Sequence, residues 1–278
     1  MRLGKSAAWV ACTAAALLAT SACGTEGAKT AAKTVDSAGK AMAALARATD
    51  RTEALGSAEV RTTTDLGNGT PIAMDGTYSW GDGNAMDVEM DTKAAKMQAL
   101  QHSPKIRCLF VGGSYYYNVD PLASGPYKGK TWIKIDGSAI FGEKGAQALA
   151  GSGGSPSASL KGLKYANDAD NLGTQTVDGR RATHYRAVVD QAHMGKFKEA
   201  YGKDSPMGSA LGVKSITMDV WVGSDDLPVR MKQQMGTMTV TLDFDKFGKT
   251  ATVKAPPASK TADLTDVVKR QQQRRTQG

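Results

Sequence analysis

Apolar and polar residues alternate along the chain with two different periods. Between Val35 and about Leu55 the apolar residues, among them Met42 and Leu45, recur at helical spacing, which predicts one amphipathic helix. From Ser57 onward the period becomes two, and apolar and polar residues alternate within short segments. The chain therefore opens with a helix and continues mainly as β-strands.

The alternating segments predict about ten strands. Two of them, residues 72–80 and 86–90, flank a Gly-Asp-Gly-Asn turn at residues 81–84, which predicts a hairpin. The last predicted strand is residues 251–254. Nearly all strands are apolar on one face only, a pattern typical of an antiparallel sheet with one solvated and one covered side. The fold class is therefore α+β.

Two further short helices are predicted, near residues 143–149 and around residues 193–201. They must lie on the apolar side of the sheet, because only that side needs a cover. Residues 151–157, Gly-Ser-Gly-Gly-Ser-Pro-Ser, are flexible by composition. Since neither side of this segment closes a sheet by itself, we interpret it as a loop within a single domain that spans residues 35–257.

The first residues have the order of an export signal. Arg2 and Lys5 precede an apolar stretch at residues 7–19, and small residues then lead to Cys23. The apolar stretch is too short to span a bilayer as a permanent helix. The sequence before Cys23 resembles a lipobox, with Thr20 at the position where that motif usually has leucine.

We predict a lipoprotein signal peptide at residues 1–22 and acylation of Cys23. Two or more acyl chains would anchor the protein stably at the outer face of the cell membrane. Residues 23–34 are small and polar, which predicts a flexible tether between the anchor and the folded domain. The alternative is ordinary signal-peptidase cleavage, which would give a secreted protein with a free Cys23.

The chain is basic, with a net charge of +8, and removal of Arg2 and Lys5 leaves about +6. Export argues against nucleic acid as a partner, so an anionic membrane surface or simple solubility accounts for the charge. Residues 258–278 are polar and end in four basic residues among glutamines. They predict a solvated basic tail, with docking on anionic lipid headgroups as the alternative.

The residues that carry most catalysis and metal binding are few. If lipidation occurs, Cys108 is left alone in the mature chain, which excludes a disulfide framework, and its apolar neighbours predict a small buried hydrophobe. His102, His184 and His193 have no metal-ligand partner at a useful spacing. The carboxylates of residues 87–91 alternate with apolar residues, which places them on a solvated sheet face. No common catalytic or phosphate-binding motif is present, so we predict no enzyme activity, no cofactor and no metal.

The order of these features is similar to that of a known family. A lipobox, a leading helix, an antiparallel sheet and the late segments at residues 178–186, 221–230 and 243–248 together resemble the LolA-like and LppX/LprAFG superfamily of bacterial lipoproteins. The resemblance covers most of residues 36–257. It implies a strongly curved half-barrel whose helices cover a concave apolar face, and a cavity that holds the acyl chains of lipids or lipoproteins.

The strand pattern independently places many methionines on the apolar face. Thioethers are flexible and polarizable, so they suit a cavity that is filled and emptied, while gap-filling in an ordinary core is the alternative. The candidate cavity-lining residues are Met74, Tyr78, Met86, Val88, Met90, Met218, Val220, Met231, Met235, Met238 and Val240.

These features predict a monomeric, membrane-anchored protein that binds a lipid or acylated molecule and carries or shields it. Residues 151–157 and 202–212 are candidates for a movable lid, or else inert surface loops. The alternative is a lipoprotein of the same fold with a solid core, which would act as an envelope sensor or through an envelope protein partner.

Overall fold

The computed structural model describes residues 23–148, 155–195, 198, 202–203, 206–248 and 250–277. Its helices are α1 (Cys23–Leu55), α2 (Gly137–Ala148), α3 (Pro156–Lys161), α5 (Pro206–Leu211) and α6 (Thr265–Gln277). Its strands are β1 (Ser57–Asp65), β2 (Ile72–Ser79), β3 (Ala85–Asp91), β4 (Lys105–Val111), β5 (Ser114–Asn118), β6 (Trp132–Asp136), β7 (Ala169–Val177), β8 (Arg180–Asp190), β9 (Ser215–Val222), β10 (Pro228–Met235), β11 (Met238–Phe247) and β12 (Thr261–Asp263).

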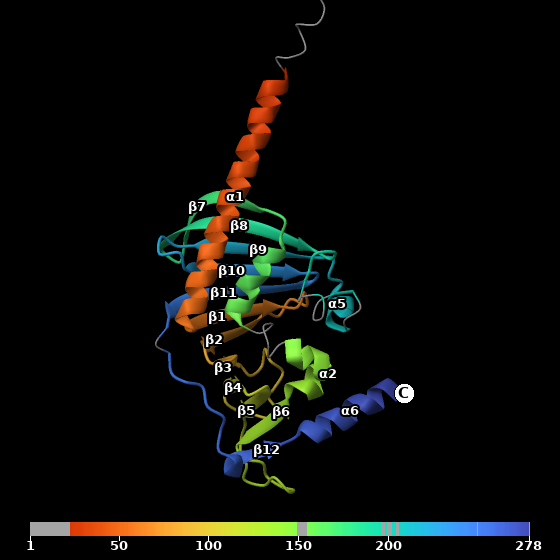
Figure 1. Ribbon diagram of the computed structural model, residues 1–278. Helices are drawn as coiled ribbons and strands as arrows, with labels where there is room; N and C mark the ends of the chain where they lie inside the picture. Colours follow the sequence, from red (N-terminus) through yellow and green to blue (C-terminus); the bar gives the residue numbers. More distant parts are fainter. Residues whose placement is uncertain are drawn as a thin grey trace, which may run out of the picture.

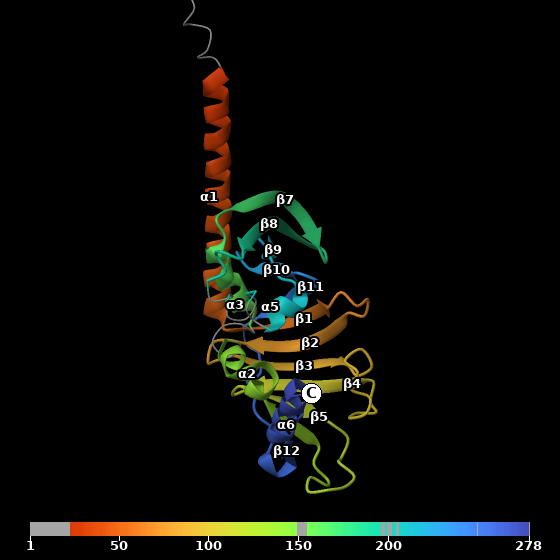
Figure 2. The ribbon, with the colours of Figure 1, turned by 90° about the vertical axis from the view of Figure 1, so that its right-hand side faces the viewer.

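The strands of the described residues form one open sheet, in the order β12-β6-β5-β4-β3-β2-β1-β11-β10-β9-β8-β7. Among these pairs only β12 and β6 are parallel. The sheet twists and curves strongly from one end to the other (Figures 1 and 2). The predicted α+β fold with a curved antiparallel sheet is therefore confirmed, with twelve strands in place of about ten.

The strand registers bring the apolar residues to one side of the sheet. Val60 of β1 pairs with Gly76 of β2, Gly76 pairs with Val88 of β3, and Val88 pairs with Cys108 of β4. Val60, Val88 and Cys108 belong to one buried cluster, and we call this side of the sheet the inner face and the opposite side the outer face. Burial raises the pKa of the Cys108 thiol to about 12, so its prediction as a small buried hydrophobe is confirmed.

Helices α1 and α3 pack on each other against the inner face of the β7–β11 half of the sheet (Figure 1). Ala41, Leu45 and Ala48 of α1 and Leu160 of α3 join the buried cluster. Helices α2 and α6 lie side by side against β6, at the other end of the sheet. The inner face therefore has separate helical covers at its two ends.

Residues 23–34, predicted as a flexible tether, are helical. Helix α1 begins at Cys23 and continues to Leu55. Alanine, lysine and glutamate favour a helix more than the two glycines of this segment oppose it, and the segment extends a helix that tertiary packing already nucleates. The first part of α1 projects beyond the sheet (Figure 1). The signal peptide predicted at residues 1–22 lies outside the described residues.

Residues 251–254, predicted as the last strand, do not form one. They lie in the connection between β11 and β12, whose residues 250–257, which we call the strap, form neither helix nor strand. Six strands lie between β11 and β12 in the sheet. The connection therefore spans seven distances between neighbouring strands, or ~34 Å. Fourteen residue steps reach about 46 Å when extended, so the strap must cross the strands rather than run along one of them.

The basic tail predicted at residues 258–278 is part of the domain instead. Strand β12 pairs with β6, and its central residue Ala262 is fully buried. The Lys134 ammonium donates to the Asp263 carboxylate at 3.1 Å, and the Asp136 N–H donates to the Thr265 hydroxyl at 3.1 Å. The prediction was wrong because a strand of three residues is too short to show an alternating pattern, and the prolines before it redirect the chain without ending the fold.

The outer face is wet and carries paired charges across the strands. Arg107 lies 2.6 Å from Asp87, and Arg61 lies 2.7 Å from Asp75. Exposed ion pairs of this kind each contribute at most about 1 kcal/mol. The carboxylate of Asp87 therefore lies on a solvated sheet face, as its alternation with apolar residues predicts.

Candidate functional site

All eleven predicted lining residues come together on the inner face. They lie on β2, β3, β9, β10 and β11, and all of them belong to or pack against one cluster. Eight are buried, and Met218, Val220 and Met231 expose none of their surface. Their common location is a finding of the structure, whereas their role in holding a ligand stays a prediction.

The methionines of this cluster are neighbours across the strands. Met74 pairs with Met90, and Met235 pairs with Met238. Met231 has Val220 on one side, and Leu45 of α1 belongs to the same cluster. Because these side chains pack on one another and on the helices, an alkyl chain could enter only if thioethers change rotamer or a helix moves away from the sheet.

Solvent reaches the cluster near the end of β1. Thr64 of β1 pairs with Ile72 on one side and with Val240 on the other, and Met74 follows Ile72 along β2. Ile72, Met74 and Val240 are all half-buried, unlike the residues deeper in the cluster. These three apolar side chains form the rim of the buried cluster at this end.

Helix α5 is attached beside this rim. The Thr237 N–H in the β10–β11 turn donates to the Leu211 carbonyl at 3.2 Å. Gly236 in the same turn has φ +58°, and a Cβ there would lie 1.9 Å from the Leu211 oxygen. The turn therefore requires glycine for α5 to approach so closely. The described part of the predicted lid at residues 202–212 thus lies beside the rim, and its role as a lid stays a prediction.

The other predicted lid, residues 151–157, is partly a buried helix start. Ser155 is buried, and its hydroxyl accepts a hydrogen bond from the Ala158 N–H at 3.1 Å as the N-cap of α3. The Ser157 hydroxyl donates to Glu53 of α1 at 2.7 Å. A serine followed by Pro156 is a helix start signal. It was overlooked because the glycines and serines of the segment are typical of a flexible loop. Residues 151–154, and most of the helix predicted at 193–201, lie outside the described residues.

Sequence reasoning missed the hydrogen bonds made by polar groups of the inner face. Gln233 of β10 is buried, and its side-chain oxygen accepts a hydrogen bond from Ser159 of α3 at 3.4 Å. Thr62 donates to the Tyr78 hydroxyl at 3.2 Å, and burial raises the pKa of Tyr78 to about 12. Gln233 could have been found, because it occupies the apolar-face position between Met231 and Met235.

A group of aromatic rings at the β4–β6 end was also missed. The ring centroid of Tyr115 lies 4.8 Å from that of Phe110, 6.4 Å from that of Tyr117 and 6.2 Å from that of Phe141 in α2. Burial raises the pKa of Tyr117. The tyrosine run at residues 115–117 marks one side of this group, but only the fold brings Phe141 to it.

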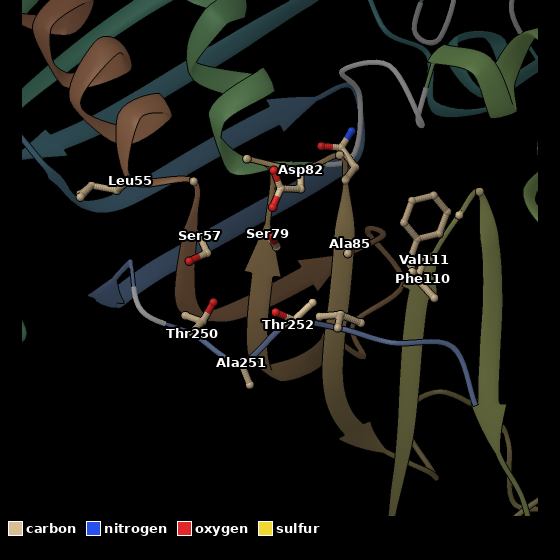
Figure 3. A pocket seen from close by; sticks show the side chains of 17 residues that line it. Leu55, Ser57, Ser79, Asp82, Ala85, Phe110, Val111, Thr250, Ala251 and Thr252 are labelled. Atoms are coloured by element: carbon tan, nitrogen blue, oxygen red, sulfur yellow. The ribbon is translucent and has the colours of Figure 1, made fainter. Parts of the chain in front are cut away.

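Two hollows with mixed polar and apolar linings lie away from the predicted lining residues. One of about 560 Å³ lies between the strap and the ends of the first strands, with Ser57, Asp82 and Thr250 around it (Figure 3). The other, of about 670 Å³, lies on the outer face, where Asp75 and Asp243 are among its lining residues. None of the eleven residues lines either hollow.

One buried histidine belongs to a network on the outer face. The distance from His184 Nε2 to Asp219 Oδ1 is 2.7 Å, and the distance from His184 Nδ1 to Gln175 Nε2 is 3.1 Å. Arg186 donates to the same Asp219 carboxylate at 2.8 Å, and the Trp221 ring stacks on His184 with centroids 4.1 Å apart. All these polar groups bond to one another across strands of the sheet, so the network joins β7, β8 and β9.

Comparison with known proteins gives distant relatives. A scan against protein-family profiles finds no match. An uncharacterized 31.2 kDa protein of Streptomyces griseus is 25% identical over 258 residues, which cover 82% of this chain and 80% of that protein. A Streptomyces coelicolor protein named "Putative lipoprotein SCO4650" is 25% identical over 240 residues, which cover 82% of this chain and 75% of that protein.

A solved structure shares the architecture. The crystal structure of the lipoprotein LppX from Mycobacterium tuberculosis superimposes with a TM-score of 0.50 at 15% identity, over 77% of this chain and 98% of LppX. No helix in the described part of the chain is both long and apolar enough to cross a membrane. The curved open sheet, its inner-face helices and this likeness show that the chain shares the fold of LppX.

Proposed function

We propose that this protein is a membrane-anchored lipoprotein that binds an acyl chain between the inner face of the sheet and helices α1 and α3. It would carry or shield the bound lipid at the outer face of the membrane. The observation that carries the proposal is the convergence of methionines from five strands on one apolar face. Unbranched thioether side chains change rotamer more easily than branched aliphatic ones, which suits an interior that must accept a guest.

The energetics allow exchange with a membrane. Each buried methylene gains about 0.8 kcal/mol relative to water, so a 16-carbon chain gains ~12 kcal/mol in a dry apolar site. The bilayer interior offers nearly the same free energy. A carrier therefore needs only to match the membrane, and small differences at the entrance decide between loading and release.

The rim at Ile72, Met74 and Val240 is the proposed entrance. It is the place where the buried cluster meets solvent beside α5. The α5 segment is held to the β10–β11 turn by the hydrogen bond between Thr237 and Leu211. Opening would require this hydrogen bond to break and Leu211 to leave the buried cluster against which it packs.

Helix α1 supports the proposed anchoring through Cys23. The described part of the helix begins at Cys23, and among the residues whose burial the structure describes the first buried core residue is Ala41. Eighteen residues of helix rise about 27 Å, so α1 would hold the domain away from the membrane that carries the acylated cysteine. The lipoprotein name of the Streptomyces coelicolor relative supports the same location.

Lipid content and probe uptake test the proposal. Protein purified from its host membrane would be extracted with organic solvent, and the extract analysed by lipid mass spectrometry. Delipidated protein would then be titrated with a fluorescent fatty acid. We expect about one lipid per protein and saturable uptake.

A matched pair of variants places the site. Val240→Trp fills the proposed entrance, and Val188→Trp adds the same ring to the outer face, where Val188 is 46% exposed. We expect Val240→Trp to weaken probe uptake at least tenfold and Val188→Trp to bind as the natural chain does, with unchanged circular dichroism in both. Absence of lipid together with absence of uptake would contradict the proposal and favour a protein of this fold that works through a protein partner.

A further inference from the structure

The hollow of about 560 Å³ beside the strap is separate from the proposed acyl site, and we call it the strap hollow. Residues from the end of α1, from the first four strands and from the turns after β2 and β4 line it, together with residues 250–253 of the strap. Figure 3 shows residues 250–252 passing across the ends of β1, β2 and β3. The volume lies within the range of about 300–1,000 Å³ that is usual for small-molecule pockets.

Backbone hydrogen bonds hold the walls of the strap hollow in place. The Gly56 carbonyl accepts from the Trp80 N–H at 2.8 Å and from the Gly81 N–H at 3.0 Å, which joins the end of α1 to the turn after β2. The Gly248 N–H donates to the Ser57 carbonyl at 2.8 Å, just before the strap. Walls that are fixed in this way need little ordering when a ligand binds.

The lining of the strap hollow combines polar and apolar groups without a positive charge. Among the described residues that line it, Asp82 is the only charged one. An anionic ligand such as a phosphate would find no cation there to balance it and would face a carboxylate. The polar residues of the lining are Ser57, Ser79, Asp82, Asn84, Thr250 and Thr252.

A mixed, uncharged lining of this kind suits a sugar ring. Sugar hydroxyls both donate and accept hydrogen bonds, while the C–H groups of the ring pack on apolar side chains. Ser57 is buried and Ser79 is half-buried, and the half-buried Leu55, Ala85 and Val111 line the same hollow. An alkyl chain in this place would take the serine hydroxyls from water without giving them a partner. We propose that the strap hollow binds a neutral sugar of one or two rings.

Asp82 provides the strongest hydrogen-bond acceptor of this site. It is exposed in the turn after β2, and a carboxylate accepts stronger hydrogen bonds from sugar hydroxyls than a neutral oxygen does. A Cβ at Gly83, Gly112 or Gly113 would meet no atom within 4 Å, so a sugar ring has room beside both turns. The proposal does not depend on the acyl site, because none of the eleven inner-face residues lines this hollow.

Glycine amide signals locate binding in the strap hollow even when it is weak. The chain is prepared with isotope-labelled glycine and titrated with maltose, trehalose, cellobiose and chitobiose in nuclear magnetic resonance spectra. We expect at least one disaccharide to shift the lining glycines saturably, with half-saturation at about 1 mM or below. Gly173 of β7, at the other end of the sheet, should not shift. The lining glycines are Gly56, Gly81, Gly83, Gly112 and Gly113.

Two matched pairs of variants place the sugar. Asp82→Ala removes the proposed acceptor and should weaken binding about tenfold or more, whereas Asp245→Ala removes an exposed carboxylate from the other hollow and should change nothing. Ala85→Phe fills the strap hollow and should abolish binding, whereas Ala73→Phe adds the same ring at an exposed position of β2 and should bind as the natural chain does. Asp82 lies in an exposed turn, so the first pair decides the question if Ala85→Phe fails to fold.

A neutral sugar can come from a glycan or from the headgroup of a glycolipid. The disaccharide that binds is therefore compared with its dodecyl glycoside below the micelle-forming concentration, both on Val240→Trp, in which the proposed acyl entrance is filled. Equal binding assigns a glycan, and tighter binding of the dodecyl glycoside assigns a lipid headgroup. Both results support a sugar site.

The opposite results overturn the inference. If no disaccharide shifts the lining glycines, or if Gly173 shifts equally, the strap hollow is not a sugar site, and the proposed lipid binding is untouched because the two sites share no residue. Unchanged binding by Asp82→Ala shows that the sugar lies elsewhere. A trialanine peptide that shifts the lining glycines at lower concentration than every disaccharide shows that the hollow binds peptides instead.

Discussion

Trp80, directly after β2, donates its indole N–H to the backbone carbonyl of Thr52 in α1 at 3.1 Å. The last carbonyls of a helix have no partner within it, so this indole supplies one for the buried end of α1. The backbone completes the cap, because the Trp80 N–H donates to the Gly56 carbonyl at 2.8 Å. Gly56 has φ +70°, the left-handed conformation common just after a helix. The junction between the leading helix and the sheet is thus fixed by one aromatic residue.

Replacing Trp80 with phenylalanine should destabilise the protein. The change keeps a buried ring but leaves the Thr52 carbonyl without its donor, which costs about 1–3 kcal/mol, and it removes buried surface as well. We expect the free energy of unfolding to fall by roughly 2–3 kcal/mol in chemical denaturation. Trp221→Phe is the control, since its indole donates to an exposed Gln175 side chain that water can satisfy. Equal losses in the two variants would contradict the capping role.

Replacing Thr52 with valine should stabilise the protein. The Thr52 hydroxyl is fully buried and, within the described residues, has no hydrogen-bond partner. Valine has nearly the same shape and no polar group to bury, while the backbone carbonyl that accepts from Trp80 is unchanged. We expect the free energy of unfolding to rise by about 1 kcal/mol. Thr49→Val is the comparison, because the Thr49 hydroxyl already donates to the Leu45 carbonyl at 2.8 Å; a rise of the same size there would show that the orphan hydroxyl is not the cause.

The sheet could be predicted from the sequence because its strands are long and one-sided. Along β9, for example, Ile216, Met218 and Val220 are buried and alternate with the half-buried Thr217. A period of two decides which face of each strand turns inward, so the eleven inner-face residues follow from the pattern alone. The curvature of the sheet came from the family resemblance and not from the pattern, and the order of the strands was not predicted.

The failures occurred where the pattern is short or where tertiary packing decides. The three residues of β12 cannot show a period, and the strap alternates only locally, where the buried Val253 lies between the exposed Thr252 and Lys254. The segment at 23–34 is weakly helical by itself and becomes part of α1 by extension of a packed helix. Gln233 and Phe141 were missed because their importance depends on partners far away in the sequence, Ser159 and Tyr115.

Gly76 of β2 should be essential for close pairing with β3. It has φ +157°, and a Cβ there would lie 2.1 Å from the backbone oxygen of Asp87. Because backbone cannot move aside as a side chain can, Gly76→Ala should separate the two strands locally and lower the free energy of unfolding by about 3 kcal/mol or more. Gly173→Ala is the control, since Gly173 has φ +86° but no atom within 4 Å of its Cβ position. We expect that variant to lose only about 1 kcal/mol from strain; equal losses in thermal or chemical denaturation would show that steric contact at Gly76 is unimportant.

Deleting residues 258–278 should damage the fold, although the sequence pattern marks them as a free tail. The deletion removes β12 and α6, exposes the edge of β6 and leaves Lys134 without the Asp263 carboxylate. An exposed strand edge promotes association between chains. We expect a lower midpoint in thermal unfolding and larger species in light scattering. Deleting only residues 274–278 keeps β12 and the first nine residues of α6 and should change neither; identical behaviour of both deletions would restore the free-tail interpretation.

The hydrogen bond between Ser114 and Asp136 should make stability depend on pH. The Ser114 hydroxyl donates to the Asp136 carboxylate at 2.6 Å, and this bond, together with the Lys134 ammonium and against partial burial, lowers the pKa of Asp136 below its ordinary value of 3.8. A carboxyl whose folded pKa is depressed stabilises the fold above its unfolded pKa, and that contribution is lost as the pH falls through the folded pKa. The difference in unfolding free energy between the natural chain and Ser114→Ala should therefore be complete at pH 6 and shrink below about pH 4. Ser224→Ala changes an exposed turn serine and should show no such trend. A constant difference for Ser114→Ala across pH 3–6, measured by chemical denaturation, would mean that the hydroxyl stabilises the fold without acting on the carboxyl.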